Sequence, residues 1–237
     1  MEATARPRIK ICCISSIDEA WTAIHAGASA LGLVSAMPSG PGPIADELIA
    51  EIAARVPPGV ASFLLTCATD AETIIRQQRA ARVNTLQLVD AVAPDVYPVL
   101  RAELPGVALV QVIHVRGPES VDEARELAPH VNAILLDSGN PAAAVKELGG
   151  TGRVHDWELS RCIREAVDVP VWLAGGLRPD NVADAVARVG PFGLDVCSGV
   201  RSGGGLDAAK LAALVAAATP PPPGTPAPAR PAAPPAR

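Results

Sequence analysis

Eight times along its length, the chain passes from a short apolar run to a longer amphipathic segment. The short runs are apolar almost throughout rather than at alternate positions, which is typical of parallel strands buried on both faces. We therefore expect strands near residues 9–14, 30–36, 61–66, 85–89, 108–113, 132–137, 169–174 and 193–198. The amphipathic segments predict helices near residues 17–26, 44–55, 71–81, 92–103, 121–128, 157–165, 179–189 and 206–218.

Eight strand–helix units in succession predict an α/β fold, a single closed (β/α)8 barrel over residues 8–218. The alternative is a doubly wound open sheet. Such sheets usually have fewer strands and an early glycine-rich phosphate turn, which this chain lacks. Residues 219–237 are almost entirely Pro, Ala and Arg. That composition cannot bury enough apolar surface to fold, so it predicts a disordered tail.

Composition excludes several classes of protein. A net charge of -5 gives no basic surface for nucleic acid, so we expect no nucleic-acid partner. No apolar run reaches the length of a membrane span, and the first residues do not resemble a secretion signal. The five cysteines fit neither a disulfide framework nor a zinc site. We therefore predict a cytoplasmic protein that binds no membrane and no metal.

Two glycine-rich segments follow the last two expected strands, at residues 173–177 (LAGGL) and 195–200 (DVCSGV). Small turns let backbone N–H groups approach an anion closely, and the positive end of a following helix adds to the attraction. In (β/α)8 barrels a phosphate group is commonly bound after strands seven and eight. The two segments together predict one phosphate site, and therefore a small phosphorylated metabolite as substrate.

Reactive side chains of a barrel come from the carboxyl ends of its strands. The sixth expected strand ends at Asp137, where burial would raise the pKa of the carboxyl and suit it to act as a general acid. Near the end of the first strand, Cys12 lies close to Lys10, which favours a thiolate base. The alternatives are that Asp137 caps a loop and that Cys12 is an inert core residue.

Seven segments carry distinctive motifs in a fixed order. They are residues 10–12 (KIC), 30–33 (ALGL), 86–88 (LQL), 135–138 (LLDS), 149–157 (GGTG, then DW), 173–182 (LAGGLRPDNV) and 195–200 (DVCSGV). In these motifs the chain resembles the phosphoribosylanthranilate isomerases of tryptophan biosynthesis, and the resemblance extends over about residues 8–218.

The resemblance implies an Amadori rearrangement of N-(5-phosphoribosyl)anthranilate that needs no metal and no organic cofactor. By position, Asp137 would protonate the ring oxygen of the sugar and open it to a Schiff base. Cys12 would then remove the C2′ proton, giving an enolamine that tautomerises to 1-(2-carboxyphenylamino)-1-deoxyribulose 5-phosphate. The residues expected to line the phosphate side are Gly150, Gly152, Gly175, Gly176, Ser198 and Gly199.

The chain departs from the family pattern mainly on the side that would hold the aromatic ring. Residues 37–43 contain no arginine, although the family has one there that helps to hold the anthranilate carboxylate. Val89 replaces a histidine, Cys13 replaces a glycine and His155 replaces a phenylalanine. Losing a charge-assisted contact to a carboxylate costs about 1.5–3 kcal/mol.

These departures keep other hypotheses open. Arg153 or His114 could replace the missing arginine, or the substrate could be a phosphoribosyl arylamine without a carboxylate. A third hypothesis is a barrel that binds sugar phosphates without chemistry, although the presence of both Cys12 and Asp137 argues against it. The sequence is compatible with a monomer or a homodimer.

Overall fold

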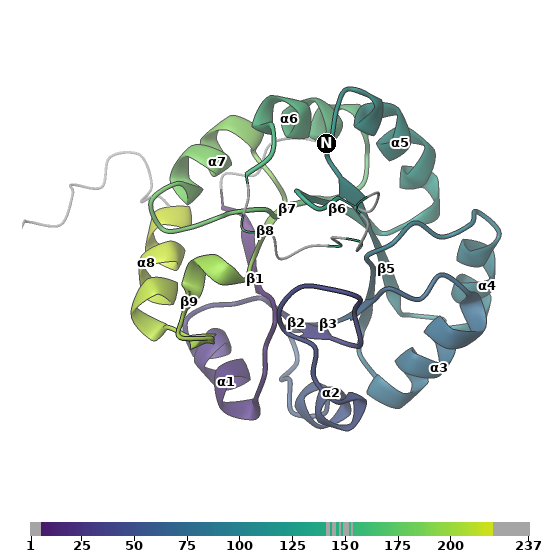
Figure 1. The fold of residues 1–237 in the computed structure, drawn as a ribbon, viewed down its shortest axis with the longest axis horizontal. Helices are drawn as coiled ribbons and strands as arrows, with labels where there is room; N and C mark the ends of the chain where they lie inside the picture. Colours follow the sequence, from purple (N-terminus) through teal and green to yellow (C-terminus); the bar gives the residue numbers. More distant parts are fainter. Residues whose placement is uncertain are drawn as a thin grey trace, which may run out of the picture.

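A computed structural model describes residues 6–140, 143, 146, 148, 152 and 154–219. Eight parallel strands follow one another around a closed barrel, and pairing of β1 with β8 completes it (Figure 1). The predicted barrel is therefore confirmed. The strands are β1 (Arg8–Ile11), β2 (Ala30–Val34), β3 (Ala61–Thr66), β4 (Thr85–Leu88), β5 (Ala108–His114), β6 (Ala133–Asp137), β7 (Val171–Leu173) and β8 (Gly193–Val196).

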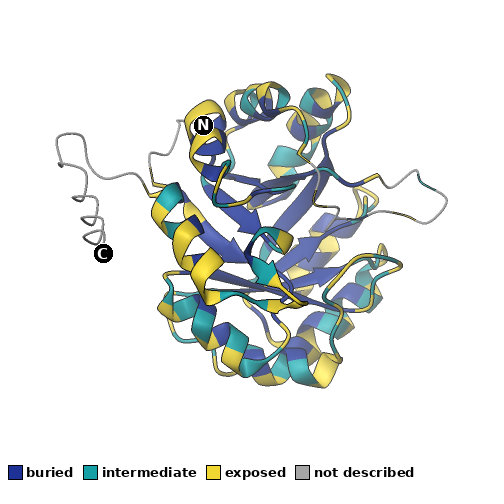
Figure 2. Cartoon of the chain, turned by 60° about the vertical axis from the view of Figure 1, so that its left-hand side comes forward, coloured by how far each residue is buried: buried dark blue, intermediate teal, exposed yellow. Residues whose placement is uncertain are grey.

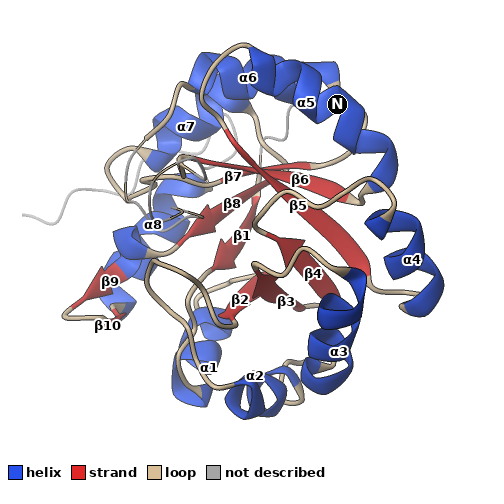
Figure 3. Ribbon diagram, turned by 45° about the vertical axis from the view of Figure 1, so that its right-hand side comes forward, coloured by secondary structure: helices blue, strands red, loops and turns tan. Residues whose placement is uncertain are grey.

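Eight α-helices form a ring outside the strands (Figures 1 and 3). They are α1 (Ile17–His25), α2 (Asp46–Ala53), α3 (Ala71–Ala81), α4 (Val96–Glu103), α5 (Glu119–Leu127), α6 (Trp157–Ala166), α7 (Val182–Val189) and α8 (Ala208–Ala218). A short 3₁₀ helix, η1 (Ala128–His130), follows α5. Helix α7 begins three residues later than predicted, because Asn181 bonds the backbone of Gly176 and Arg178 and holds that stretch as a turn.

The connection between β8 and α8 is more elaborate than the sequence predicts. A 3₁₀ helix, η2 (Ser198–Val200), leads into a small hairpin of β9 (Arg201–Ser202) and β10 (Gly205–Leu206), which projects at one side in Figure 3. Glu19 of α1 anchors the hairpin, since its carboxylate accepts hydrogen bonds from Arg201 and from the Leu206 backbone. This loop is therefore fixed against the first strand–helix unit.

The core has two apolar layers, and buried strand residues contribute to both (Figure 2). One apolar layer lies between strands and helices, and a second fills the barrel. Near the starts of their strands, Phe63, Trp172 and Phe192 stack edge to face with ring centroids 5.6–5.7 Å apart. The aromatic rings pack against one another at that end of the barrel, where a second cavity is lined by all three of them. No helix in the described part of the chain is long and apolar enough to cross a membrane.

The expected boundary between barrel and tail falls at the edge of the described residues. β1 begins at Arg8 and α8 ends at Ala218, so every element of the barrel falls within residues 8–218. Apart from Thr219, the segment 219–237 lies outside the described residues. Its assignment as a tail stays a prediction.

Candidate active site

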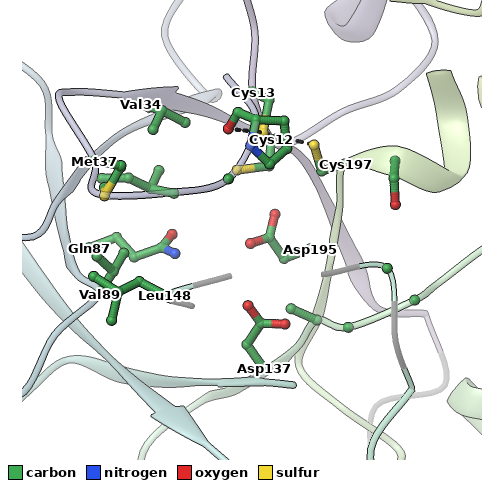
Figure 4. Close-up of a pocket in the computed structure, with 18 of the residues that line it drawn as sticks. Cys12, Cys13, Val34, Met37, Gln87, Val89, Asp137, Leu148, Asp195 and Cys197 are labelled. Atoms are coloured by element: carbon green, nitrogen blue, oxygen red, sulfur yellow. Dashed lines mark hydrogen bonds between the residues drawn. The ribbon is translucent and has the colours of Figure 1, made fainter. Parts of the chain in front are cut away.

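A cavity opens at the carboxyl ends of the strands. That is the end at which barrel enzymes place their active sites. Figure 4 shows the thiols on one side of this cavity, Asp137 on the opposite side and Asp195 between them. The predicted site residues among those that line it are Cys12, Asp137, Gly152, Gly175, Gly176 and Ser198.

Asp137 is the last residue of β6 and is only 7% exposed. Burial raises the pKa of its carboxyl, against the opposing effects of a 2.7 Å hydrogen bond from the Ser138 N–H and of the neighbouring His114. The carboxylate of Asp195 raises this pKa further. A carboxyl that keeps its proton in this way can donate it to a substrate oxygen.

Cys12 follows β1 directly and continues its pairing with β8, since its N–H donates to the Val196 carbonyl at 2.8 Å. The thiol projects into the barrel beside Gly32 of β2, where an added Cβ would lie 2.8 Å from the Cys12 sulfur. Cys12 is 6% exposed and shares the cavity with Asp137 on the opposite wall (Figure 4). A substrate held between them would meet an acid on one side and a thiol on the other.

A buried ion pair supports this arrangement, and the sequence analysis did not single it out. Lys10 of β1 and Asp195 of β8 face each other in register, with Nζ 2.8 Å from a carboxylate oxygen. Burial alone would lower the pKa of Lys10, but attraction to Asp195 raises it above its ordinary value. The available signal was a charged residue flanked by apolar residues in each of the two strands that close the barrel.

The glycine-rich turns after β7 and β8 form the third side of the cavity. Gly175 and Gly176 have φ of +84° and +62°, which glycine adopts without strain. An added Cβ at Gly152 would lie 3.6 Å from the Ser198 hydroxyl, so the β6–α6 segment reaches the same place. Small residues from three connections therefore converge, as an anion cradle requires.

The remaining two predicted phosphate residues differ from this group. A Cβ added to Gly199 would lie 1.9 Å from the Leu177 carbonyl oxygen, so Gly199 holds the two turns together at close range. Gly150 lies outside the described residues. The helix expected near residues 206–218 is α8, but it does not follow the second turn directly, because η2 and the hairpin β9–β10 intervene. Backbone N–H groups of the turns, not a long helix dipole, are the available donors there.

The side expected to hold an aromatic ring is mostly apolar, although the amide of Gln87 also lies there (Figure 4). Val34, Met37, Leu65, Val89 and Leu148 line it, and Figure 4 shows most of them grouped away from the thiols. Among the lining residues that the structure describes, none has a cationic side chain.

Of the two replacements considered for the missing arginine, His114 uses Nε2 in a 3.1 Å contact with the Val89 carbonyl, and Arg153 lies outside the described residues. A different cation lies at the rim. Lys146 forms an ion pair with Asp90, and its carbonyl accepts a hydrogen bond from Ser39.

Comparison with known proteins agrees with the motifs and the fold. The sequence model of the N-(5'-phosphoribosyl)anthranilate isomerase family matches residues 9–217. The isomerase of that name from Haloferax volcanii is 39% identical over 213 residues, covering 89% of this chain and 92% of that protein.

Two solved structures are similar over the whole barrel. The phosphoribosyl anthranilate isomerase of Thermus thermophilus has a TM-score of 0.74 at 27% identity, covering 89% of this chain and 97% of that chain. Another phosphoribosyl anthranilate isomerase was solved with reduced 1-(o-carboxyphenylamino)-1-deoxyribulose 5-phosphate. It has a TM-score of 0.73 at 25% identity, covering 90% of this chain and 98% of that chain. With the family's motifs, its fold and this level of identity, the chain belongs to the N-(5'-phosphoribosyl)anthranilate isomerase family.

Proposed function

We propose that the protein isomerises N-(5'-phosphoribosyl)anthranilate to 1-(2-carboxyphenylamino)-1-deoxyribulose 5-phosphate, a step of tryptophan biosynthesis. The observation that carries the proposal is one cavity with Cys12 and Asp137 on opposite walls and small turns at a third side. Family membership supplies the reaction, and these positions supply its acid, its base and its phosphate anchor. We place the enzyme in the cytoplasm, as a monomer or a homodimer.

Asp137 begins the reaction as general acid. Its raised pKa favours the protonated form, which donates to the ring oxygen of the sugar as the C1′–O bond breaks. The product of this step is an open-chain Schiff base with the former ring oxygen as a hydroxyl. Cys12 then accepts the C2′ proton, and the resulting enolamine tautomerises to the aminoketose. Each group contributes about 10²–10⁴ in rate.

The anthranilate carboxylate needs a cation that the lining residues do not supply, and we assign this role to Lys146. The cavity is lined by Leu148, two residues after Lys146, and by Val89, which precedes Asp90. Ser39 also lines it and donates a hydrogen bond to the Lys146 carbonyl. An ammonium has three N–H donors, and the ion pair with Asp90 uses one of them. A carboxylate at the rim can therefore be bound beside Asp90.

Steady-state kinetics of purified variants test the catalytic roles. We expect Asp137→Asn and Cys12→Ala each to lower kcat at least about 100-fold, while both still bind the reduced product analogue. Cys162→Ser is the matched control for Cys12→Ala, because Cys162 is an exposed thiol on α6. Full turnover by Asp137→Asn would exclude Asp137 as the acid, whereas binding of the product analogue without any turnover by the unaltered protein would favour a barrel that binds sugar phosphates without chemistry.

The apolar ring side favours one second candidate, an isomerase for a phosphoribosyl arylamine without a carboxylate. Comparing N-(5'-phosphoribosyl)anthranilate with N-(5'-phosphoribosyl)aniline separates the two. If Lys146 binds the carboxylate, Lys146→Met raises KM about tenfold for the anthranilate compound only, as expected for a charge-assisted contact. Faster turnover of the aniline compound by the unaltered protein, with no effect of Lys146→Met, would establish the second candidate.

A further inference from the structure

Two thiols unused by the proposed reaction lie against each other at the rim of the cavity. The sulfur atoms of Cys13 and Cys197 are 2.7 Å apart (Figure 4). Cys13 belongs to the connection after β1 and Cys197 to the turn after β8, so they are 184 residues apart in sequence. Both line the same cavity as Cys12.

The backbone of Cys13 directs its side chain toward this contact. Successive side chains of a regular strand point to opposite faces, so Cys12 and Cys13 would normally diverge. Cys13 instead has φ of +61°, a conformation that few residues other than glycine adopt. Both thiols therefore line the cavity, and the Cys13 sulfur turns to Cys197.

Neighbouring segments hold the two thiols in place. The Cys13 sulfur contacts the Pro41 carbonyl at 3.5 Å, and a Cβ added to Gly42 would lie 2.6 Å from the Cys13 Cβ. Arg201, four residues after Cys197, donates a hydrogen bond to the Cys13 carbonyl and is itself paired with Glu19 at 3.0 Å. A disulfide bond of about 2.05 Å would need the sulfurs to approach by only about 0.7 Å.

The two thiols also differ in their chemistry. The hydrogen bond between the two thiols lowers the pKa of Cys197 despite its burial, and the guanidinium of Arg201 lowers it further. Cys197 is partly exposed, so a small oxidant can reach it. The contacts with Cys12 and Cys197, together with burial, raise the pKa of Cys13. Cys197 therefore suits the attacking thiolate and Cys13 the resolving thiol.

We propose that Cys13 and Cys197 are an oxidation site at which hydrogen peroxide forms a reversible disulfide. The Cys197 thiolate attacks one peroxide oxygen, the O–O bond breaks, and a proton from solvent completes a water molecule, leaving a sulfenic acid. The Cys13 sulfur then attacks the sulfenic sulfur, and the departing hydroxide takes the Cys13 proton as a second water. Two thiols are oxidised by two electrons, and the peroxide is reduced to two waters.

The disulfide lowers the proposed isomerase activity, a consequence that depends on the proposed function. Ser198 of the anion cradle follows Cys197 directly, and Cys12 precedes Cys13. Closing the sulfur–sulfur gap draws the β8–η2 turn and the connection after β1 together. Displacements of this size in positioning groups cost about tenfold to 100-fold in rate. We expect at least a tenfold loss of kcat/KM on oxidation, restored by dithiothreitol.

The chemical part of the proposal is tested without any activity assay. The reduced protein is treated with hydrogen peroxide, alkylated and digested, and its mass is measured. We expect a loss of two hydrogen atoms and a linked peptide pair containing Cys13 and Cys197. Cys162→Ser, which removes an exposed thiol elsewhere, should form the same link, and Cys197→Ser should form none. Oxidation of Cys12 with Cys13 and Cys197 left as thiols would overturn the proposal.

The activity part uses each protein as its own reference, before and after peroxide. We expect the activity of the unaltered enzyme and of Cys162→Ser to fall and to recover with dithiothreitol. The residual activity of Cys197→Ser should lack this recoverable loss. A complete Cys13–Cys197 link with unchanged turnover would refute regulation while leaving the isomerase intact. No turnover by the reduced enzyme would instead contradict the proposed function and leave the mapped disulfide unaffected.

Discussion

Breaking the buried ion pair between Lys10 and Asp195 should destabilise the barrel far more than breaking an exposed pair of equal length. The two groups are 0% and 8% exposed and lie 2.8 Å apart. At an effective dielectric constant of about 20, opposite charges at this distance attract each other by about 6 kcal/mol. Removing one partner leaves the other charge buried and unpaired, which costs about 3–5 kcal/mol.

The assay is a double-mutant cycle followed by urea unfolding. Lys10→Met and Asp195→Asn should each lower the free energy of unfolding by about 3–5 kcal/mol. The double variant should lose only about 1–3 kcal/mol, because it retains a buried amide but no unpaired charge. The pair Arg79–Glu103 is the control, since it has the same 2.8 Å separation but is 59% and 52% exposed. Its coupling energy should be below about 1 kcal/mol.

The pH of the cycle follows from the direction of the Lys10 shift. The folded pKa of Lys10 is raised above its ordinary 10.5, so its stabilising contribution is complete below that pH and declines only in more alkaline solution. Measurements at pH 7 therefore report the full contribution. A coupling energy for Lys10 and Asp195 no larger than that of the exposed pair would refute the reasoning. If a single variant does not fold, recovery of folding in the double variant would likewise show that the two buried charges are coupled.

Three further variants test other parts of the structure. Burial lowers the pKa of His155 from 6.5 to about 4. The free energy of unfolding should therefore fall by up to about 3 kcal/mol as the pH is lowered from 6.5 to about 4, because the unfolded chain binds a proton that the folded protein does not. Urea unfolding of His155→Phe should lack this loss. Gly199→Ala should raise KM at least about tenfold by separating the two turns, whereas Gly205→Ala, whose added Cβ meets nothing closer than 3.9 Å, should leave KM unchanged. Gly32→Ala places a Cβ 2.8 Å from the Cys12 sulfur, so kcat should fall at least about tenfold with circular dichroism unchanged.

The regular part of the barrel was predictable because its signal is local. Strand β3 and helix α3 have the predicted bounds at both ends, since apolar runs and amphipathic periods are read within one segment. The hairpin β9–β10 was missed because two-residue strands contain no period to detect. The late start of α7 was missed because it depends on side-chain bonds from Asn181 to a preceding turn.

The site was predictable where motif and strand position coincide. Cys12 and Asp137 lie at strand ends within recognisable motifs, and the structure brings them to one cavity. Asp195 and Cys197 lie within a quoted motif, yet their partners are more than 180 residues away in β1 and the connection after it. Which residues face each other there is decided by the β1–β8 register, which no local pattern specifies.

The closure of the barrel and the proposed chemistry share this β1–β8 seam. Along β1 and its extension, Lys10 and Cys12 point inward at alternate positions, and the positive φ of Cys13 adds a second thiol on the same side. Across the seam, β8 and its turn supply Asp195 and Cys197. A slip of one residue between these strands would turn the side chains of the slipped strand to the opposite face. The seam therefore has one functional register, and the Lys10–Asp195 ion pair favours it, because a slipped pairing would leave both charges buried without a partner.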